Sequence, residues 1–133
     1  MAKRRSVSYY NSIKVYRREW RAKQVQRCML CLDAKKPEKL QVHEIERKSQ
    51  SPNNWWPLED KDGNDINGCN GILTCGFCHA TKFDTMPHAK QLAIKLISDP
   101  DHFNLEAWLS IKPRPSSYVT MEEVMEEVRK MMP

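Results

Sequence analysis

No long apolar run occurs anywhere in this chain of 133 residues. Its apolar stretches fall well short of the roughly 18 residues that a membrane-spanning helix needs, and the basic N-terminus lacks the apolar segment of a secretory signal. Internal repeats and low-complexity segments are absent as well. We therefore expect a soluble, cytoplasmic protein with no membrane partner. Its length indicates a single domain, which a structural metal would help to stabilise.

Acidic residues are scarce near the N-terminus. Residues 1–27 contain nine lysines and arginines against one acidic residue, Glu19, a local charge of +8; the whole chain carries +5, so residues 28–133 sum to −3. A basic segment of this kind attracts phosphates and gives salt-dependent affinity for nucleic acid without sequence information. The alternative interpretation is a solvated helix face.

The few cysteines are clustered. Four of the five form two Cys-x-x-Cys pairs, Cys28 with Cys31 and Cys75 with Cys78, and the fifth is Cys69. Zinc knuckles use this spacing because a tight turn directs both thiolates at one tetrahedral ion. The pattern favours a structural zinc over disulfides, and Cys69 is interpreted as a small hydrophobic residue.

Polar residues around these pairs follow a recognisable order. An asparagine stands shortly before the second pair, a histidine directly follows it, and a His-Glu dipeptide lies upstream in a stretch of alternating apolar residues. These residues are Asn70, His79, His43 and Glu44. With this order, the segment 28–83 resembles the HNH, or ββα-metal (His-Me finger), endonucleases. The resemblance implies an α+β fold, in which a zinc-stapled ββα-metal core carries flanking helices.

The resemblance also implies how the chain is divided. Residues 1–27 would form a basic N-terminal helix or arm, residues 28–83 the metal core, and residues 84–133 supporting helices, all in one compact domain. The four thiolates would form a closed zinc site that ties the segment before the first strand to the following helix. A second, exchangeable cation, Mg²⁺ or Mn²⁺ with Ni²⁺ or Zn²⁺ as alternatives, would serve catalysis.

The family pattern assigns catalytic roles. Two adjacent first-strand residues supply a metal ligand and a general-base histidine, while the helix supplies a further ligand. Asn70 and His79 match their family positions, whereas the strand pair departs from the usual form. Two registers stay open: either His43 is a ligand beside His79 and Glu44 is the weaker base, or His43 is the base and Glu44 or a water completes the coordination.

These features predict a metal-dependent endonuclease that hydrolyses DNA phosphodiester bonds by nicking or double-strand cleavage. The alternative is a catalytically inactive zinc-binding module that binds DNA or helps to assemble a nucleoprotein machine. Small proteins of this kind resemble those of bacteriophages and mobile elements, which would place this one in the host-cell cytoplasm. The candidate DNA contacts are Arg17, Arg18, Arg21, Arg47, Lys48 and Lys82.

Periodicity assigns the motifs to helices and strands. Helical spacing of apolar residues predicts a helix over 8–26, and alternation predicts a strand over 40–45. A second strand is predicted over 71–75, followed by a helix through 82. Turn residues predict a polar loop over 49–69.

Besides a short helix that packs Phe103, Leu105 and Trp108 against the core, two further helices are predicted on the C-terminal side. The first begins at Pro87, which suits a first helical turn. Its predicted apolar stripe consists of Leu92, Ala93, Leu96 and Ile97. The second begins with a capping box formed by Thr120 and Glu123. Its apolar face, either docked on the domain or bound to a partner, consists of Met121, Val124, Val128 and Met131.

Overall fold

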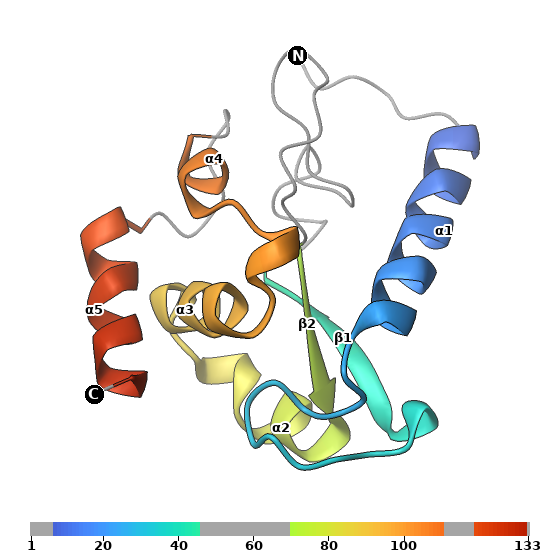
Figure 1. Ribbon diagram of the computed structural model, residues 1–133, viewed down its shortest axis with the longest axis horizontal. Coiled ribbons are helices and arrows are strands. Elements are labelled where there is room, and N and C mark those ends of the chain that lie inside the picture. The colour runs from blue at the N-terminus through green and yellow to red at the C-terminus, as the bar shows by residue number, and fades with distance from the viewer. Residues whose placement is uncertain (1–6, 46–69, 111–118, 133) are drawn as a thin grey trace.

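The computed structural model describes residues 7–45, 70–110 and 119–132, with side chains from residue 15 onward. Helices and a small two-stranded sheet make up these ranges, so the α+β class is confirmed. In the same ranges, no helix is long and apolar enough to cross a membrane. In chain order the elements are α1 (Val7–Lys23), β1 (Leu40–Glu44), β2 (Gly71–Cys75), α2 (Gly76–Thr81), α3 (His88–Ser98), α4 (Leu105–Leu109) and α5 (Met121–Met131) (Figure 1).

The two strands form an antiparallel pair in which Leu40 lies opposite Cys75. β2 is buried along its whole length, whereas β1 is fully buried only at its first residue. The difference arises because β2 has neighbours on both edges: β1 pairs with one, and the segment around Met29 covers the other, with a hydrogen bond of 2.8 Å from Met29 N to Leu73 O. Both strands are predicted by the sequence, and the predicted bounds of β2 agree with the structure.

The helices lie on both sides of the sheet. In Figure 1, α1 stands on one side, α3 on the other, and α5 packs outside α3. The core between them is apolar, and Trp20 from α1, Leu73 from β2 and Trp108 from α4 are among its buried side chains. α2 follows β2 without an intervening loop and contacts both strands. The order strand, strand, helix places the end of β2 directly against the start of α2.

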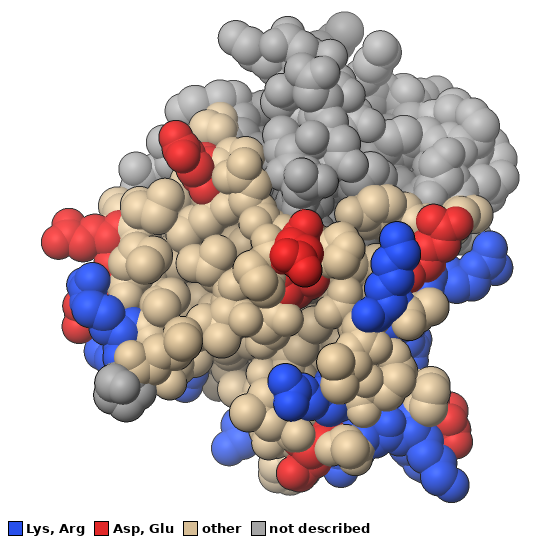
Figure 2. Space-filling model, viewed as in Figure 1, with Lys and Arg blue, Asp and Glu red and all other residues tan. Residues whose placement is uncertain are grey.

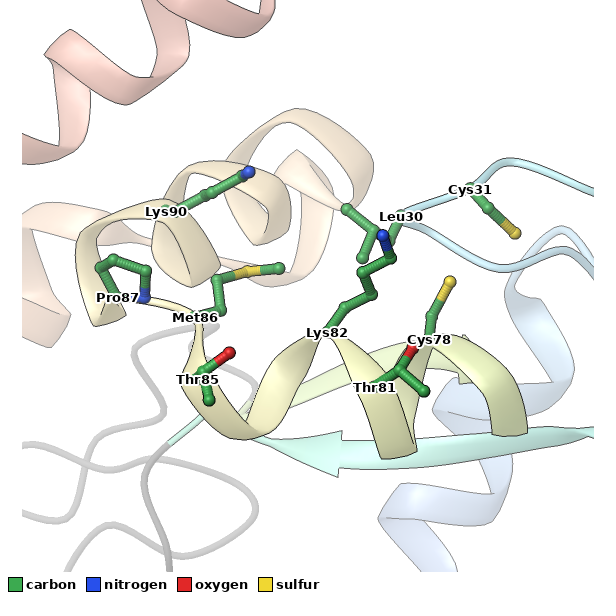
Figure 3. Close-up of a pocket in the computed structure, with 9 residues that line it drawn as sticks. All are labelled: Leu30, Cys31, Cys78, Thr81, Lys82, Thr85, Met86, Pro87 and Lys90. Atoms are coloured by element: carbon green, nitrogen blue, oxygen red, sulfur yellow. The ribbon is translucent and has the colours of Figure 1, made fainter.

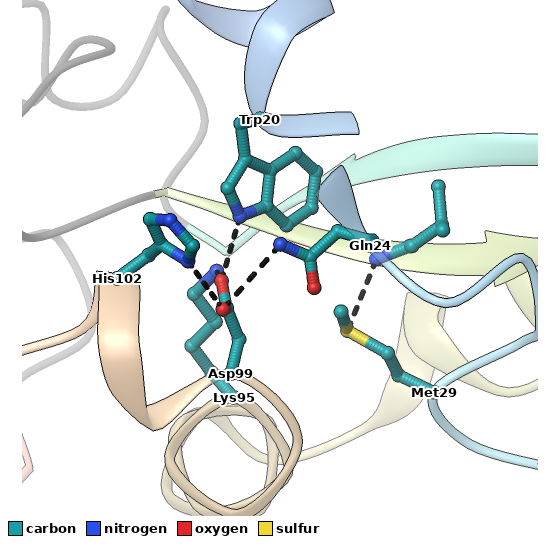
Figure 4. Close-up of polar contacts among 7 residues, drawn as sticks. Trp20, Gln24, Met29, Lys95, Asp99 and His102 are labelled. Atoms are coloured by element: carbon teal, nitrogen blue, oxygen red, sulfur yellow. Dashed lines mark hydrogen bonds and ion pairs between the residues drawn. The ribbon is translucent and has the colours of Figure 1, made fainter. Parts of the chain in front are cut away.

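A buried polar cluster joins α1 to the end of α3 (Figure 4). The indole Nε1 of Trp20 donates to Asp99 Oδ2 at 2.6 Å, and the ammonium of Lys95 donates to the same oxygen at 2.7 Å. His102 Nδ1 lies 2.7 Å from the other carboxylate oxygen, Oδ1. The Lys95 ammonium also lies 4.5 Å from the centroid of the Trp20 ring, a cation–π distance. The side chain of Lys95 is 0% exposed and that of Asp99 4%.

The electrostatics of this cluster favour the ionised carboxylate. Burial raises the pKa of Asp99, but the positive charge of Lys95 and the hydrogen bonds that the carboxylate accepts outweigh burial and hold this pKa below its usual value. A carboxyl group with a lower pKa in the folded state stabilises the fold above its unfolded pKa of about 3.9, and this contribution is lost as the pH falls through the folded pKa.

We predict that Asp99→Asn lowers the free energy of unfolding by about 3–5 kcal/mol at pH 7, because the substitution leaves the buried charge of Lys95 uncompensated. The difference should shrink in acid, once the pH has fallen through the lowered pKa of Asp99, because protonation then removes the same charge from the wild type. Denaturant unfolding at several pH values measures both effects. Asp101→Asn, at an exposed position in the same turn, is the matched control; equal losses in the two variants would contradict the prediction.

The buried face of α3 differs from the predicted stripe. Leu92 and Ala93 are buried as predicted, but Leu96 and Ile97 are only half-buried. The helix begins at His88, one residue after Pro87. The remaining buried positions are Ala89, Gln91, Ile94 and Lys95. Two polar side chains therefore occupy the inner face, which a purely apolar pattern does not predict.

The final helix keeps its predicted start. The Thr120 side chain accepts from Glu123 N at 3.2 Å, and the Glu123 carboxylate accepts from Thr120 N at 3.1 Å, which confirms the capping box. Val124 is fully buried, and Val128 and Met131 pack against the core. The prediction for Met121 is wrong: this first residue of α5 is 40% exposed.

Candidate metal centre and histidine pair

The four paired cysteines converge on one point. Their sulfur atoms all lie within 4.8 Å of one another, and all four are free thiols rather than disulfides. A tetrahedral zinc with zinc–sulfur bonds of about 2.3 Å places its sulfurs about 3.8 Å apart, which is close to this arrangement. The cluster could therefore hold a metal ion such as zinc. Cys28, Cys75 and Cys78 are buried, and Cys31 is exposed.

The first cysteine pair lies on a tight turn. The backbone N–H groups of Leu30 and Cys31 donate to Cys28 Sγ at 3.4 and 3.5 Å, and Leu32 N closes the turn on Cys28 O at 2.9 Å. Leu32 has a φ of 66°, in the left-handed region that glycine adopts more readily. The turn directs backbone N–H groups at the sulfur, an arrangement that stabilises a thiolate ligand.

The second pair spans the start of α2. Cys75 is the residue before the helix and Cys78 lies in its first turns. Burial raises the pKa of the Cys28 thiol, but hydrogen bonds from the backbones of Cys31 and Cys75 and from the Thr74 hydroxyl lower it to about 6. Burial raises the pKa of Cys78, as do its hydrogen bond with Cys75 and the charge of Cys28. Cys28 is thus ready to bind a cation as a thiolate, whereas a bound cation would have to deprotonate Cys78.

Two of the predicted site residues form a histidine pair. The ring centroids of His43 on β1 and His79 on α2 lie 5.4 Å apart, with an angle of 65° between the ring planes. His43 also stacks on Phe83 at a centroid distance of 4.6 Å. Its Nε2 lies 2.7 Å from Oε1 of Gln91. Because His79 directly follows Cys78, the helix that carries one cysteine of the cluster also carries one imidazole.

Glu44 lies in a different environment from His43. Successive side chains of a strand point to opposite faces of the sheet, and His43 faces α2. The Glu44 carboxylate instead accepts a hydrogen bond of 2.8 Å from Arg17 on α1, with both side chains about one third exposed. The structure therefore brings His43 and His79 together and pairs Glu44 with the N-terminal helix.

Asn70 lies at the start of β2, beside the end of β1. Its carbonyl accepts a hydrogen bond of 3.2 Å from Ile45 N, and the residue is 1% exposed. This contact continues the strand pairing by one residue beyond Glu44 and Gly71. Asn70 therefore lies two residues before Ile72, which is the residue of β2 that pairs with His43. Its position is buried.

The predicted DNA contacts have different surroundings. Arg17 binds Glu44, and the guanidinium of Arg21 donates to the backbone carbonyls of Pro37 and Leu40. Arg18 and Lys82 are exposed. Arg47 and Lys48 lie outside the described residues. Figure 2 shows that basic side chains, with some acidic ones among them, are concentrated on the lower right of this face.

A groove of about 490 Å³ opens beside the cysteine cluster (Figure 3). Lys82 from the end of α2 and Lys90 from α3 both line it, together with the hydroxyl-bearing residues Thr81 and Thr85. None of its described lining residues is acidic. Lys82 is among the predicted DNA contacts, but Lys90 is not, because the sequence pattern places Lys90 in a supporting helix.

Two residues that contact His43, Phe83 and Gln91, are not predicted by the sequence. Phe83 has no distinguishing motif, and Gln91 is a single polar residue within an apolar helix face.

No protein-family model, curated protein or solved structure matches this chain.

Proposed function

We propose that this protein is a metal-dependent endonuclease of the HNH type that hydrolyses DNA phosphodiester bonds. The observation that carries the proposal is the contact between His43 and His79. β1 presents His43 and α2 presents His79, with their ring centroids 5.4 Å apart. The cysteine cluster lies on the same unit of two strands and a helix. The core segment 28–83 therefore contains both a candidate structural metal site and a pair of groups that can bind a cation and transfer a proton.

The proposal assigns two metals. Zinc in the four-cysteine cluster is structural, since four protein thiolates leave no position for water or substrate. The catalytic cation, Mg²⁺ or Mn²⁺ with Ni²⁺ or Zn²⁺ as alternatives, binds at the histidine pair, where imidazole suits the transition metals best. When bound, this cation would stabilise the negative charge that develops on the phosphate.

The environment of Glu44 favours one of the two registers. Its carboxylate pairs with Arg17, and its neighbour His43 is the strand residue that meets His79. We therefore assign His43 as the general base that accepts a proton from the attacking water and His79 as the ligand of the cation. Asn70, buried at the end of the strand pair, would orient the site from β2. An imidazole, with an ordinary pKa of about 6.5, is also the better base near neutral pH.

The basic groove provides a path for the DNA backbone. Lys82 lies three residues after His79, about one helical turn away, and Lys90 faces the same groove from α3. Ammonium groups on two walls of a groove without acidic lining suit the phosphates that flank a scissile bond. Arg21 already donates to backbone carbonyls and Arg17 to Glu44, so both hold α1 on the core.

We predict that the double substitution Lys82→Ala and Lys90→Ala weakens DNA binding equally on all sequences. Each lost phosphate contact should reduce the slope of log affinity against log salt by about 0.9, so the double variant should lose roughly 2. Fluorescence anisotropy over a salt series measures the slope. Lys130→Ala, at an exposed position on α5, is the control, and an unchanged slope in the double variant would contradict this assignment.

A supercoiled-plasmid assay tests the proposed activity. The wild-type protein should convert supercoiled DNA to the nicked or linear form when Mg²⁺, Mn²⁺, Ni²⁺ or Zn²⁺ is added, and EDTA should stop the reaction. If the protein binds DNA but cleaves it with none of these cations, the alternative replaces the proposal. The protein would then be a zinc-binding module that binds DNA or assembles a nucleoprotein complex of a phage or mobile element.

A further inference from the structure

We infer that Gln91 is a positioning residue for His43. Gln91 holds the proton of the neutral imidazole on Nε2 of His43 and so leaves the reactive lone pair on Nδ1. This inference deepens the proposed function and rests on it for its catalytic consequence. It concerns a residue of α3, outside the segment that carries the cysteines and the two histidines.

The orientation of the Gln91 amide follows from its two hydrogen bonds. Its Nε2 lies 2.9 Å from the carbonyl oxygen of Met86. A carbonyl oxygen only accepts, so the amide nitrogen must face Met86 and the amide oxygen must face the other way. That oxygen, Oε1, lies 2.7 Å from Nε2 of His43.

The proton of His43 follows from the orientation of Gln91. Oε1 of Gln91 has no hydrogen and can only accept, so Nε2 of His43 is the donor. In a neutral imidazole one nitrogen donates and the other carries the lone pair. The tautomer with the proton on Nε2 is therefore stabilised, and Nδ1 is the atom that takes up a proton or meets a cation.

Gln91 is also rigid enough to serve this purpose. Its side chain is 3% exposed and lies on the face of α3 that buries Ala89 and Leu92. A buried amide costs free energy unless its polar atoms are hydrogen-bonded, and Met86 and His43 supply these bonds. Phe83, stacked on the His43 ring at 4.6 Å, limits rotation of the imidazole. Hydrogen bonds of this kind commonly fix the tautomer and orientation of functional histidines.

The first test reads the tautomer directly and needs no cleavage. Side-chain ¹⁵N NMR of the full, zinc-loaded chain, at a pH at which His43 is neutral, should show a proton on Nε2 alone in the wild type. Gln91→Met keeps the length of the side chain but removes the amide, and His43 should become a mixture of tautomers. Gln41→Met, at an exposed position on β1, is the control and should leave His43 unchanged; His43→Ala assigns the signals.

The second test is kinetic. Gln91→Met should lower kcat about 10- to 100-fold, the usual loss on removing such a partner, with little change in KM, because Gln91 is buried and contacts His43. Gln91→Glu retains an oxygen that accepts from His43 Nε2 and should keep the wild-type tautomer and recover most of kcat. A purely structural contribution of Gln91 to packing would not change the tautomer.

The outcomes separate this inference from the proposed function. An unchanged His43 tautomer in Gln91→Met, or cleavage by that variant at the wild-type rate, overturns the inference and leaves the nuclease proposal intact. A tautomer shift in a protein that cleaves no DNA supports the positioning by Gln91 and overturns the nuclease proposal alone. If Gln91→Met does not fold, Gln91→Glu decides, since a mixture of His43 tautomers in that variant also overturns the inference.

Discussion

Removing the metal from the four-cysteine cluster should unfold the core of this protein. The cluster joins the turn at Cys28, which precedes β1 and covers the edge of β2, to the start of α2 at Cys78. Structural zinc contributes roughly 10–16 kcal/mol in small zinc domains, as much as or more than the 5–15 kcal/mol that holds a typical domain folded. We expect about one zinc per chain by elemental analysis and loss of the near-ultraviolet circular dichroism signal with a strong chelator.

Substitution of single cysteines tests the same prediction without a chelator. Cys75→Ser and Cys78→Ser should each lose zinc and unfold, because a closed tetrahedron lacks a spare ligand. Cys69→Ser, which removes the cysteine that stands outside the pairs, should retain zinc and fold. A purified protein without zinc, or one whose spectrum survives complete removal of the metal, would refute the structural assignment.

His43→Ala and His79→Ala should each abolish DNA nicking. Loss of a general base typically costs 10²–10⁴-fold in rate, and loss of a cation ligand removes the charge stabilisation that the cation supplies. Zinc content and DNA affinity should stay close to those of the wild type, because the two imidazoles belong to neither the cysteine cluster nor the basic groove. Plasmid nicking, elemental analysis and anisotropy on the same preparations measure the three properties.

The assigned roles differ in their response to the cation. Higher cation concentration should partly restore His79→Ala, which loses a ligand, but not His43→Ala, which loses the base. Glu44→Gln should retain most of the activity, since this carboxylate pairs with Arg17. His88→Ala, at the start of α3, is the control. If both His43→Ala and His79→Ala cut like the wild type, the nuclease proposal is wrong and the zinc-module alternative stands.

Features that depend on neighbouring residues could be predicted from the sequence. The short apolar segment Gly71–Cys75 defined β2, and the Thr120–Glu123 spacing defined the start of α5. The candidate ligands also followed from local spacing, because two cysteines in a Cys-x-x-Cys pair can face the same ion. In each case the signal lies within a few residues along the chain.

Features that depend on residues distant in the chain could not be predicted from the sequence. Lys95 reads as a solvent-exposed residue of a helix, and its burial makes sense only beside Asp99 and Trp20. Gln91 is buried because it bonds His43, which lies 48 residues away in the chain. For the same reason a count of charges could not separate Arg18, which is exposed, from Arg21, which donates to backbone carbonyls.

The division of the ligands into two local pairs has a consequence for folding kinetics. Each pair spans only four residues, so either one can capture a metal ion before the strands meet. The connection between β1 and β2 is long, and closing a long chain segment carries an entropic cost that slows folding. If one cysteine pair already holds an ion, the chain closes when the two thiolates of the other pair bind that ion. The folding rate of the core should therefore depend on the free metal concentration, whereas a hairpin closed by a short turn would fold at a rate independent of it.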